Sequence, residues 1–197
     1  MNSRTLISYI SRTAIFGGIA AILYCVPGLQ FSLPGVAPSF MSIHLEDIPI
    51  LLSSFAYGPL LGVFEIILKT LIKLPFSSTL CVGELGDFIF SLALILPASV
   101  IYKNNRTLKG AIIGTIVGFL TNLFFSTIVN LYTIFPLYKI VLGGDEGFIS
   151  DMFNGLFGWE IKNDYDPVIA VMLIPFNLIK NTIVVLATFI CYKPLRY

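Results

Sequence analysis

Apolar runs separated by short polar breaks dominate this chain, and six of the runs are long enough to form helices. The pattern predicts helices at about residues 5–27, 43–56, 59–74, 84–103, 107–137 and 167–192. About 20 apolar residues cross a bilayer as a helix, and the short loops leave no room for a separate soluble domain. The sequence therefore predicts an all-α polytopic membrane protein, in which residues 1–197 form a single transmembrane domain of six helices.

Proline and glycine mark the breaks between these runs. Pro27 ends the first predicted helix, and Gly58 with Pro59 makes a tight turn between the second and the third, since both residue types interrupt helices. The segment 28–42 is rich in these residues but remains apolar, which indicates a cap rather than a loop in water. The connection 138–166 carries six of the eleven acidic residues, and we expect it to lie over the outer face.

Composition supports the membrane class. Hydrophobic residues make up 56% of the chain and charged residues 12%, whereas soluble domains carry about 25% charged residues. The mean hydropathy is +0.90. The net charge is +1 and no basic patch is present, so we expect membrane lipid around the protein and no nucleic-acid partner.

The distribution of charge predicts an orientation. If the amino terminus is cytoplasmic, the inner segments carry no acidic residue. Their basic residues are Arg4, Arg12, Lys103, Arg106, Lys109, Lys193 and Arg196. Most acidic residues then fall in the outer loops and at the outer ends of helices. Because cytoplasmic loops are enriched in Lys and Arg, both termini are predicted to be cytoplasmic.

A charged residue lies inside the last apolar run. Lys180 shares one helical face with Asn177, which lies three positions before it, and with Asn181, which directly follows it. A lysine at bilayer depth costs about 2.5–3.5 kcal/mol unless something compensates it. No acidic residue shares its helix at that depth, so we expect a neutral ligand rather than an ion pair, with Asn130 as a further polar group. Hydrogen bonds between helices are the alternative explanation for the asparagines.

The other polar residues have simpler interpretations. Glu84 and Asp87 open the fourth predicted helix, where acids complement the helix dipole. His44 is expected to be a solvated residue at the membrane interface. Glu65 and Lys69 are four residues apart on the third predicted helix, a spacing that predicts an ion pair along the helix.

Small residues form a stripe on the first predicted helix: Ala14, Gly17, Gly18 and Ala21, at positions i, i+3, i+4 and i+7. Such a stripe lets another helix approach closely. The approaching helix belongs either to this chain or to a partner subunit, and the spacing leaves both possibilities open.

Catalytic and nucleotide-binding motifs are absent from the sequence. It contains no Walker loop, no G-x-S-x-G and no H-E-x-x-H, and its three cysteines lack metal-site spacing. We therefore predict no enzymatic activity, no ATP hydrolysis by this chain itself, no bound metal and no cofactor.

Several strings, in order from about residue 10 to 195, resemble a known transporter family. Asp47-Ile48-Pro49 and the segment 58–63 are similar to the opening half of substrate-binding S components of energy-coupling factor (ECF) vitamin transporters. Four further strings resemble the later helices of the riboflavin-specific branch: Gly83-Glu84-Leu85, Leu96-Pro97-Ala98, Asn130 with Pro136 and Tyr138, and the segment 175–180.

The resemblance implies a six-helix receptor in the bacterial plasma membrane, with a vitamin pocket near the outer face capped by the first loop. It implies no activity of its own. Uptake would require docking onto a module of one transmembrane coupling subunit and two ATPases. In that family an Ala-x-x-x-Ala stripe on the first helix contacts the coupling subunit, and here Ala14 with Gly18 and Gly17 with Ala21 take its place.

The resemblance also implies riboflavin as the transported ligand. It assigns Asn130, Asn177 and Lys180 to the polar edge of the flavin, and the cap to an apolar wall. The remaining implied ligand-binding residues are Phe31, Leu33, Phe40 and Glu84. The family more often shows asparagine where Asp87 stands. Alternatives are an S component for another vitamin, of the pyridoxine or pantothenate type, or a non-transporting scaffold in which the polar residues only hold helices together.

Overall fold

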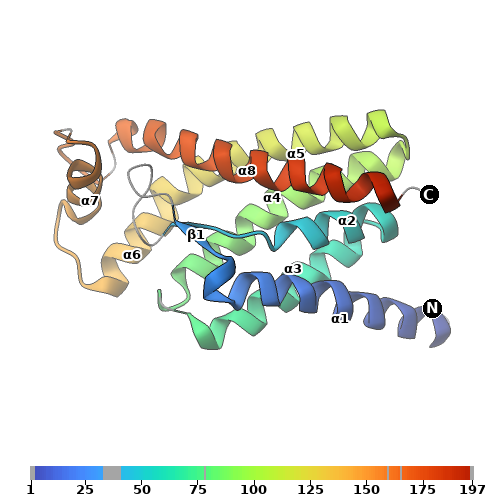
Figure 1. Ribbon diagram of the computed structural model, residues 1–197. Coiled ribbons are helices and arrows are strands. Elements are labelled where there is room, and N and C mark those ends of the chain that lie inside the picture. The colour runs from blue at the N-terminus through green and yellow to red at the C-terminus, as the bar shows by residue number, and fades with distance from the viewer. Residues whose placement is uncertain (1–2, 33–40, 78, 159, 165, 196–197) are drawn as a thin grey trace.

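The computed structural model describes residues 3–32, 41–77, 79–158, 160–164 and 166–195. Within these ranges the chain is almost wholly helical (Figure 1). The helices are α1 (Ser3–Cys25), α2 (Asp47–Tyr57), α3 (Pro59–Lys73), α4 (Val82–Asn104), α5 (Leu108–Val129), α6 (Phe135–Leu142), α7 (Phe148–Phe157) and α8 (Pro167–Leu195). Short 3-10 turns occupy Pro27–Leu29 and Leu74–Phe76.

The long helices lie alongside one another in a bundle (Figure 1). α4 packs along α5, and α1 packs along α3. The α4–α5 approach is close because Gly114 and Gly118 face the backbone carbonyls of Ala98 and Leu94, where a side chain would collide. α1 begins and α8 ends at the same end of the bundle, while α7 lies at the opposite end (Figure 1).

Four helical stretches in the described part of the chain are long and apolar enough to cross a membrane. They are Ser3–Cys25, Val82–Asn104, Leu108–Val141 and Leu173–Cys191. The sequence predicts six spans, but α2 and α3 have only 11 and 15 residues, fewer than the roughly 20 that a full span needs. The membrane class therefore rests on four candidate spans.

The second predicted helix begins later than the sequence pattern indicates. Ser42–Ile43 forms a short strand, β2, which pairs antiparallel with β1 (Phe31–Ser32). α2 then begins at Asp47 rather than near residue 43. The ladder joins the two ends of the predicted cap, so residues 41–44 lie as extended chain beside the helices.

The fifth predicted helix extends beyond residue 137 and changes its winding. α5 passes into a π-helical segment, Asn130–Ile134, and then into α6, which ends at Leu142. In the π turn the N–H of Phe135 donates to the carbonyl of Asn130. The next residue is Pro136, which lacks an N–H and clashes with the carbonyl four residues before it. A wider turn before the proline accommodates that clash, and such turns are frequent at functional sites.

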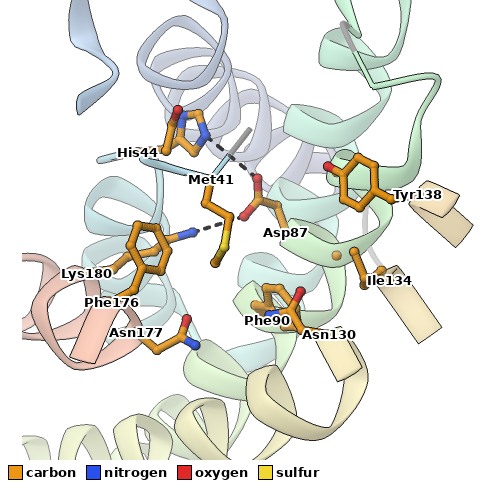
Figure 2. Close-up of a pocket in the computed structure, with 13 residues that line it drawn as sticks. Met41, His44, Asp87, Phe90, Asn130, Ile134, Tyr138, Phe176, Asn177 and Lys180 are labelled. Carbon is orange, nitrogen blue, oxygen red and sulfur yellow. Dashed lines mark hydrogen bonds and ion pairs between the residues drawn. The ribbon is translucent and has the colours of Figure 1, made fainter. Parts of the chain in front are cut away.

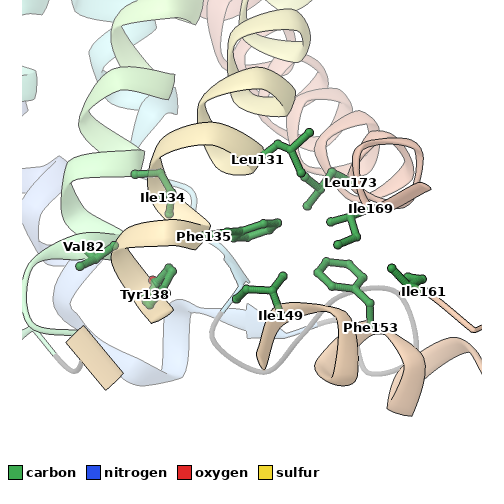
Figure 3. Close-up of a cluster of buried hydrophobic side chains, with 10 residues drawn as sticks. All are labelled: Val82, Leu131, Ile134, Phe135, Tyr138, Ile149, Phe153, Ile161, Ile169 and Leu173. Carbon is green, nitrogen blue, oxygen red and sulfur yellow. The ribbon is translucent and has the colours of Figure 1, made fainter. Parts of the chain in front are cut away.

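The connection after α6 contains a helix that the sequence pattern did not predict. The first turn of α7 is held by Asp164, whose carboxylate accepts hydrogen bonds from the backbone N–H groups of Gly147, Ile149 and Ser150. Lys139 pairs with the same carboxylate at 3.4 Å. Phe153 and Ile149 of α7 point toward Phe135 in a buried apolar cluster that also includes residues of α8 (Figure 3). This cluster attaches α7 to the bundle.

Candidate functional site

A polar pocket lies where α4, the π-helical segment, α6, α8 and residues 41–44 meet (Figure 2). Its cavity volume is about 60 Å³, below the roughly 300–1,000 Å³ that is usual for small-molecule sites, so a ligand larger than a few atoms requires the pocket to widen. Its polar side chains include His44, Asp87, Asn130, Tyr138, Asn177 and Lys180. Met41, Phe90, Ile134 and Phe176 supply apolar walls.

Helical spacing explains why these side chains meet. Asn130, Ile134 and Tyr138 follow one another at intervals of four residues across the π-helical segment and α6, so they point to one side. Asn177 and Lys180 are three residues apart on α8. The three residues that the sequence singles out for a polar ligand edge, Asn130, Asn177 and Lys180, therefore line one pocket from two helices.

Lys180 is buried and forms an ion pair. Its side-chain nitrogen lies 3.0 Å from Oδ1 of Asp87 on α4, a residue 93 positions away in the chain. The expectation that Lys180 has no acidic partner is wrong, because it considered only the helix that carries the lysine. A buried cation without a counter-charge is costly, and the packing of α4 against α8 supplies the counter-charge.

The second oxygen of Asp87 faces α1 and the strand β2. It accepts a hydrogen bond from the hydroxyl of Tyr24 at 2.8 Å, and His44 Nε2 lies 3.9 Å away (Figure 2). His44 is only 8% exposed and its ring meets Tyr24 edge-on, so the prediction of a solvated histidine is wrong. Burial lowers the pKa of His44, although Glu46 and Asp87 oppose that shift, and the ring is therefore neutral at neutral pH.

The two pocket asparagines have unused hydrogen-bonding groups. Asn130 Nδ2 is buried and has no partner among the described residues. Asn177 donates its Nδ2 to the backbone carbonyl of Leu173 at 3.1 Å, and no described residue donates to its side-chain oxygen. Asn181 behaves differently, because it donates to Asn122 Oδ1 at 2.7 Å. A hydrogen bond between helices thus explains Asn181, but not Asn130 or Asn177.

Of the remaining residues implied by the resemblance, Glu84 and Phe31 lie outside the pocket lining. Glu84 is buried and accepts hydrogen bonds from Ser77 at 2.7 Å and Thr79 at 3.1 Å, so it secures the loop before α4 and does not line the pocket. Phe31 on β1 is half exposed and also lies outside the lining. Leu33 and Phe40 fall outside the described residues.

A second buried charge cluster lies behind the pocket. Lys69 is fully buried, and its nitrogen contacts Glu46 at 3.1 Å, Asp47 at 3.0 Å and Ser91 at 2.7 Å. The predicted pairing of Glu65 with Lys69 is therefore wrong. Glu65 accepts a hydrogen bond from Ser53 on α2 instead, because Lys69 turns toward the acids at the start of that helix.

The small-residue stripe of α1 divides into two halves. Gly17 and Ala21 are buried, and a Cβ on Gly17 would lie 2.9 Å from the side chain of Leu68 on α3. Ala14 is exposed beside an apolar groove between α1 and α3, and Gly18 has nothing within 4 Å of its missing Cβ. One half packs inside this chain, and the other faces outward.

The chain is similar in sequence to known transporter components. A family model described as "ECF transporter, substrate-specific component" matches residues 8–192. The chain is 28% identical over 177 residues to riboflavin transporter RibU of Staphylococcus aureus, covering 90% of this chain and 86% of that protein. It is 24% identical over 191 residues to riboflavin transporter FmnP of Bacillus subtilis, covering 94% and 93%.

A solved structure has a closely similar fold. It is described as "Structure and mechanism of the S component of a bacterial ECF transporter", and it aligns with a TM-score of 0.75 and 25% sequence identity. The alignment covers 97% of this chain and 96% of that one.

Proposed function

This chain belongs to the family of substrate-specific components of ECF transporters, and from that premise we propose that its pocket captures riboflavin for uptake across a bacterial cell membrane. A protein of this family recognises a transported substrate and is not an enzyme. The relatives named as riboflavin transporters match along nearly the whole chain, which supports riboflavin as the ligand.

The observation that carries the proposal is the set of free polar groups in the pocket. Asn130 offers a buried donor and Asn177 an acceptor. Lys180 has three N–H groups, of which one is directed to Asp87, so two remain for a ligand. The pyrimidine edge of riboflavin presents two carbonyl acceptors on either side of an N–H donor, and these three residues complement that order of groups.

The apolar part of the pocket suits the rest of the flavin ring system. Phe90, Phe176 and Met41 line it beside the polar groups. Flat aromatic ligands pack well against aromatic rings and against the polarisable sulfur of methionine. We place the polar edge of the flavin at the asparagines and its dimethylbenzene end toward the apolar walls and the cap.

The topology belongs to the same proposal. We place both termini in the cytoplasm and the pocket near the outer face, within one transmembrane domain of six helices in which α2 and α3 are the short members. The shared end of α1 and α8 (Figure 1) and the basic residues of the inner segments support this orientation. For transport, the chain docks onto a coupling subunit with two ATPases through Ala14 and Gly18, the outward half of its stripe.

Ligand binding by the purified protein tests the proposal. The protein is purified in detergent, freed of bound ligand by unfolding and refolding, and titrated into riboflavin. We expect the flavin fluorescence to be quenched, with a break at one ligand per protein, and Asn130→Ala to weaken binding. A matched control is Asn163→Ala in an exposed loop, which leaves binding unchanged. A refolded protein that quenches no riboflavin would contradict the proposal.

A further inference from the structure

Resting on the proposed riboflavin function, we propose that Asp87 determines the charge selectivity of the pocket. By pairing with Lys180 it leaves no free positive charge at the polar edge. The pocket therefore accepts an uncharged ligand and rejects one that carries negative charge on the edge facing Lys180.

The charges that line the pocket balance one another. Among the described lining residues Asp87 and Lys180 are the charged side chains, and they lie 3.0 Å apart. His44 is the other titratable group near this pair, 3.9 Å from Asp87, and its buried ring is neutral at neutral pH. A negative ligand entering the pocket thus meets a cation whose charge is already compensated.

The carboxylate of Asp87 is held in position from both sides. Oδ1 accepts from Lys180 and Oδ2 accepts from the hydroxyl of Tyr24 at 2.8 Å. Tyr24 is itself almost fully buried and lies near the end of α1. Because each oxygen has a fixed donor, the carboxylate cannot readily swing away to release Lys180 for an anionic ligand.

Lys69, the fully buried cation behind the pocket, is also paired with acidic side chains. Lys69 is in contact with two carboxylates, those of Glu46 and Asp47. Lys73 is half-buried and donates to the backbone carbonyl of Tyr24 at 3.3 Å. Counting Lys69, Glu46 and Asp47 with the Asp87–Lys180 pair gives two cations and three carboxylates, so this buried group opposes a further negative charge.

Removing the charge of Asp87 is expected to shift the preference of the pocket from neutral ligands toward anionic ones. In Asp87→Asn, Lys180 loses the one carboxylate that contacts it, and an anionic ligand can take the place of that carboxylate. Charges in such surroundings interact more strongly than in water, because little solvent screens them. An opposite charge at contact distance typically changes an ionisation equilibrium by a factor of about 10 to 1,000, and the same factor applies to the relative affinity for neutral and anionic ligands.

Two flavins of nearly equal size provide the test. Riboflavin is neutral at pH 7, whereas 8-hydroxyriboflavin is an anion whose charge spreads onto the pyrimidine edge. Dissociation constants for both are measured at pH 7 with the wild type and with Asp87→Asn. We expect the wild type to prefer riboflavin, and the substitution to shift the ratio of the two constants toward the anion by at least about tenfold. Asp151→Asn, on the exposed face of α7, is the matched control and leaves the ratio unchanged.

Lys180→Gln gives an independent measurement if Asp87→Asn does not fold. In Lys180→Gln the carboxylate of Asp87 stays in the pocket without its cation, so the ratio of the two dissociation constants shifts further in favour of riboflavin. A wild type that binds the anion as tightly as riboflavin overturns the inference, as does an unchanged ratio in a folded Asp87→Asn. In both cases riboflavin still binds, so the proposed function stands. A wild type that binds neither flavin contradicts the proposed function itself, and the inference falls with it.

Discussion

At the scale of single residues, the pocket depends on a few polar groups buried among apolar side chains. Lys180 is tolerable at this depth because Asp87 compensates its charge. Breaking a buried pair by removing one partner is strongly destabilising, since the other charge stays buried and unpaired. The same pair also supplies donors to the proposed ligand. Stability and binding are therefore linked at this position, and a single substitution changes both.

A double substitution separates the two effects. We expect Lys180→Met to lower the free energy of unfolding by about 3–5 kcal/mol, because Asp87 loses its counter-charge, and to weaken riboflavin binding. Lys180→Met combined with Asp87→Asn recovers most of the stability without recovering the affinity, since the ligand still lacks the lysine donors. Thermal unfolding in detergent and fluorescence titration measure the two quantities.

Recovery of both stability and affinity in the double variant would show that Lys180 has a purely structural role. If the double variant regained both stability and wild-type affinity, Lys180 would contribute to binding only by holding α4 against α8. The scaffold interpretation of the polar residues would then apply to this pair.

At the scale of elements, one acidic side chain caps the first turn of α7, in addition to the apolar cluster that attaches this helix to the bundle. Asp164 lies after the helix in the chain, yet its carboxylate accepts from three N–H groups at the beginning of α7. Free N–H groups at a helix start need such acceptors. Burial opposes ionisation of this carboxyl group, but hydrogen bonds from the backbone of Ser150 and Gly147, with the side chain of Lys139, hold its pKa below the usual value.

This lowered pKa predicts how stability depends on pH. The folded pKa lies below the unfolded one, so the contribution of Asp164 is present above the unfolded pKa and is lost as pH falls through the folded pKa. We expect Asp164→Asn to be less stable than the wild type near pH 7, by about 1 kcal/mol. The difference shrinks as the solution is acidified, and melting temperatures measured along a pH series follow it.

Asp151→Asn is the control for this series, because Asp151 is exposed on the same helix. Its melting temperature is measured at the same pH values. A constant difference between Asp164→Asn and the wild type at every pH would show that the carboxylate charge contributes nothing to holding α7.

At the scale of the whole molecule, α1 has two different faces. Its inner face packs on α3 through Gly17 and Ala21, while Ala14 and Gly18 face outward. The C-terminal end of α1 also contacts the pocket, since Tyr24 donates to Asp87. One helix therefore contacts both the ligand site and, in the proposed function, the coupling subunit.

Bulky substitutions distinguish the two faces. We expect Gly18→Trp to abolish riboflavin uptake by cells while leaving binding by the purified protein intact, because its side chain projects away from the fold. Gly17→Trp is the contrasting variant. It must displace Leu68 of α3, so it lowers the melting temperature. Loss of binding in Gly18→Trp would contradict this assignment of faces, as would normal uptake.

Much of the architecture follows from the order of residues alone. Apolar runs and their breaks predict the membrane class and the approximate positions of the helices, because helix formation and burial depend on composition and spacing within each segment. The same spacing indicates that Asn177 and Lys180 share a face. The small two-residue ladder, the π turn and α7 are not apparent, since each depends on contacts with distant segments.

The partners of the buried charges were decided only by the tertiary structure. The sequence by itself determined that Lys180 needs a compensating group, and that Asn130 and Asn177 are costly unless bonded. It did not determine that Asp87 pairs with Lys180, that His44 is buried beside them, or that Lys69 turns to Glu46 and Asp47. The physical reason is that a pattern along the chain reports which side chains need a partner, whereas the packing of helices far apart in the chain selects which partner is within 3–4 Å.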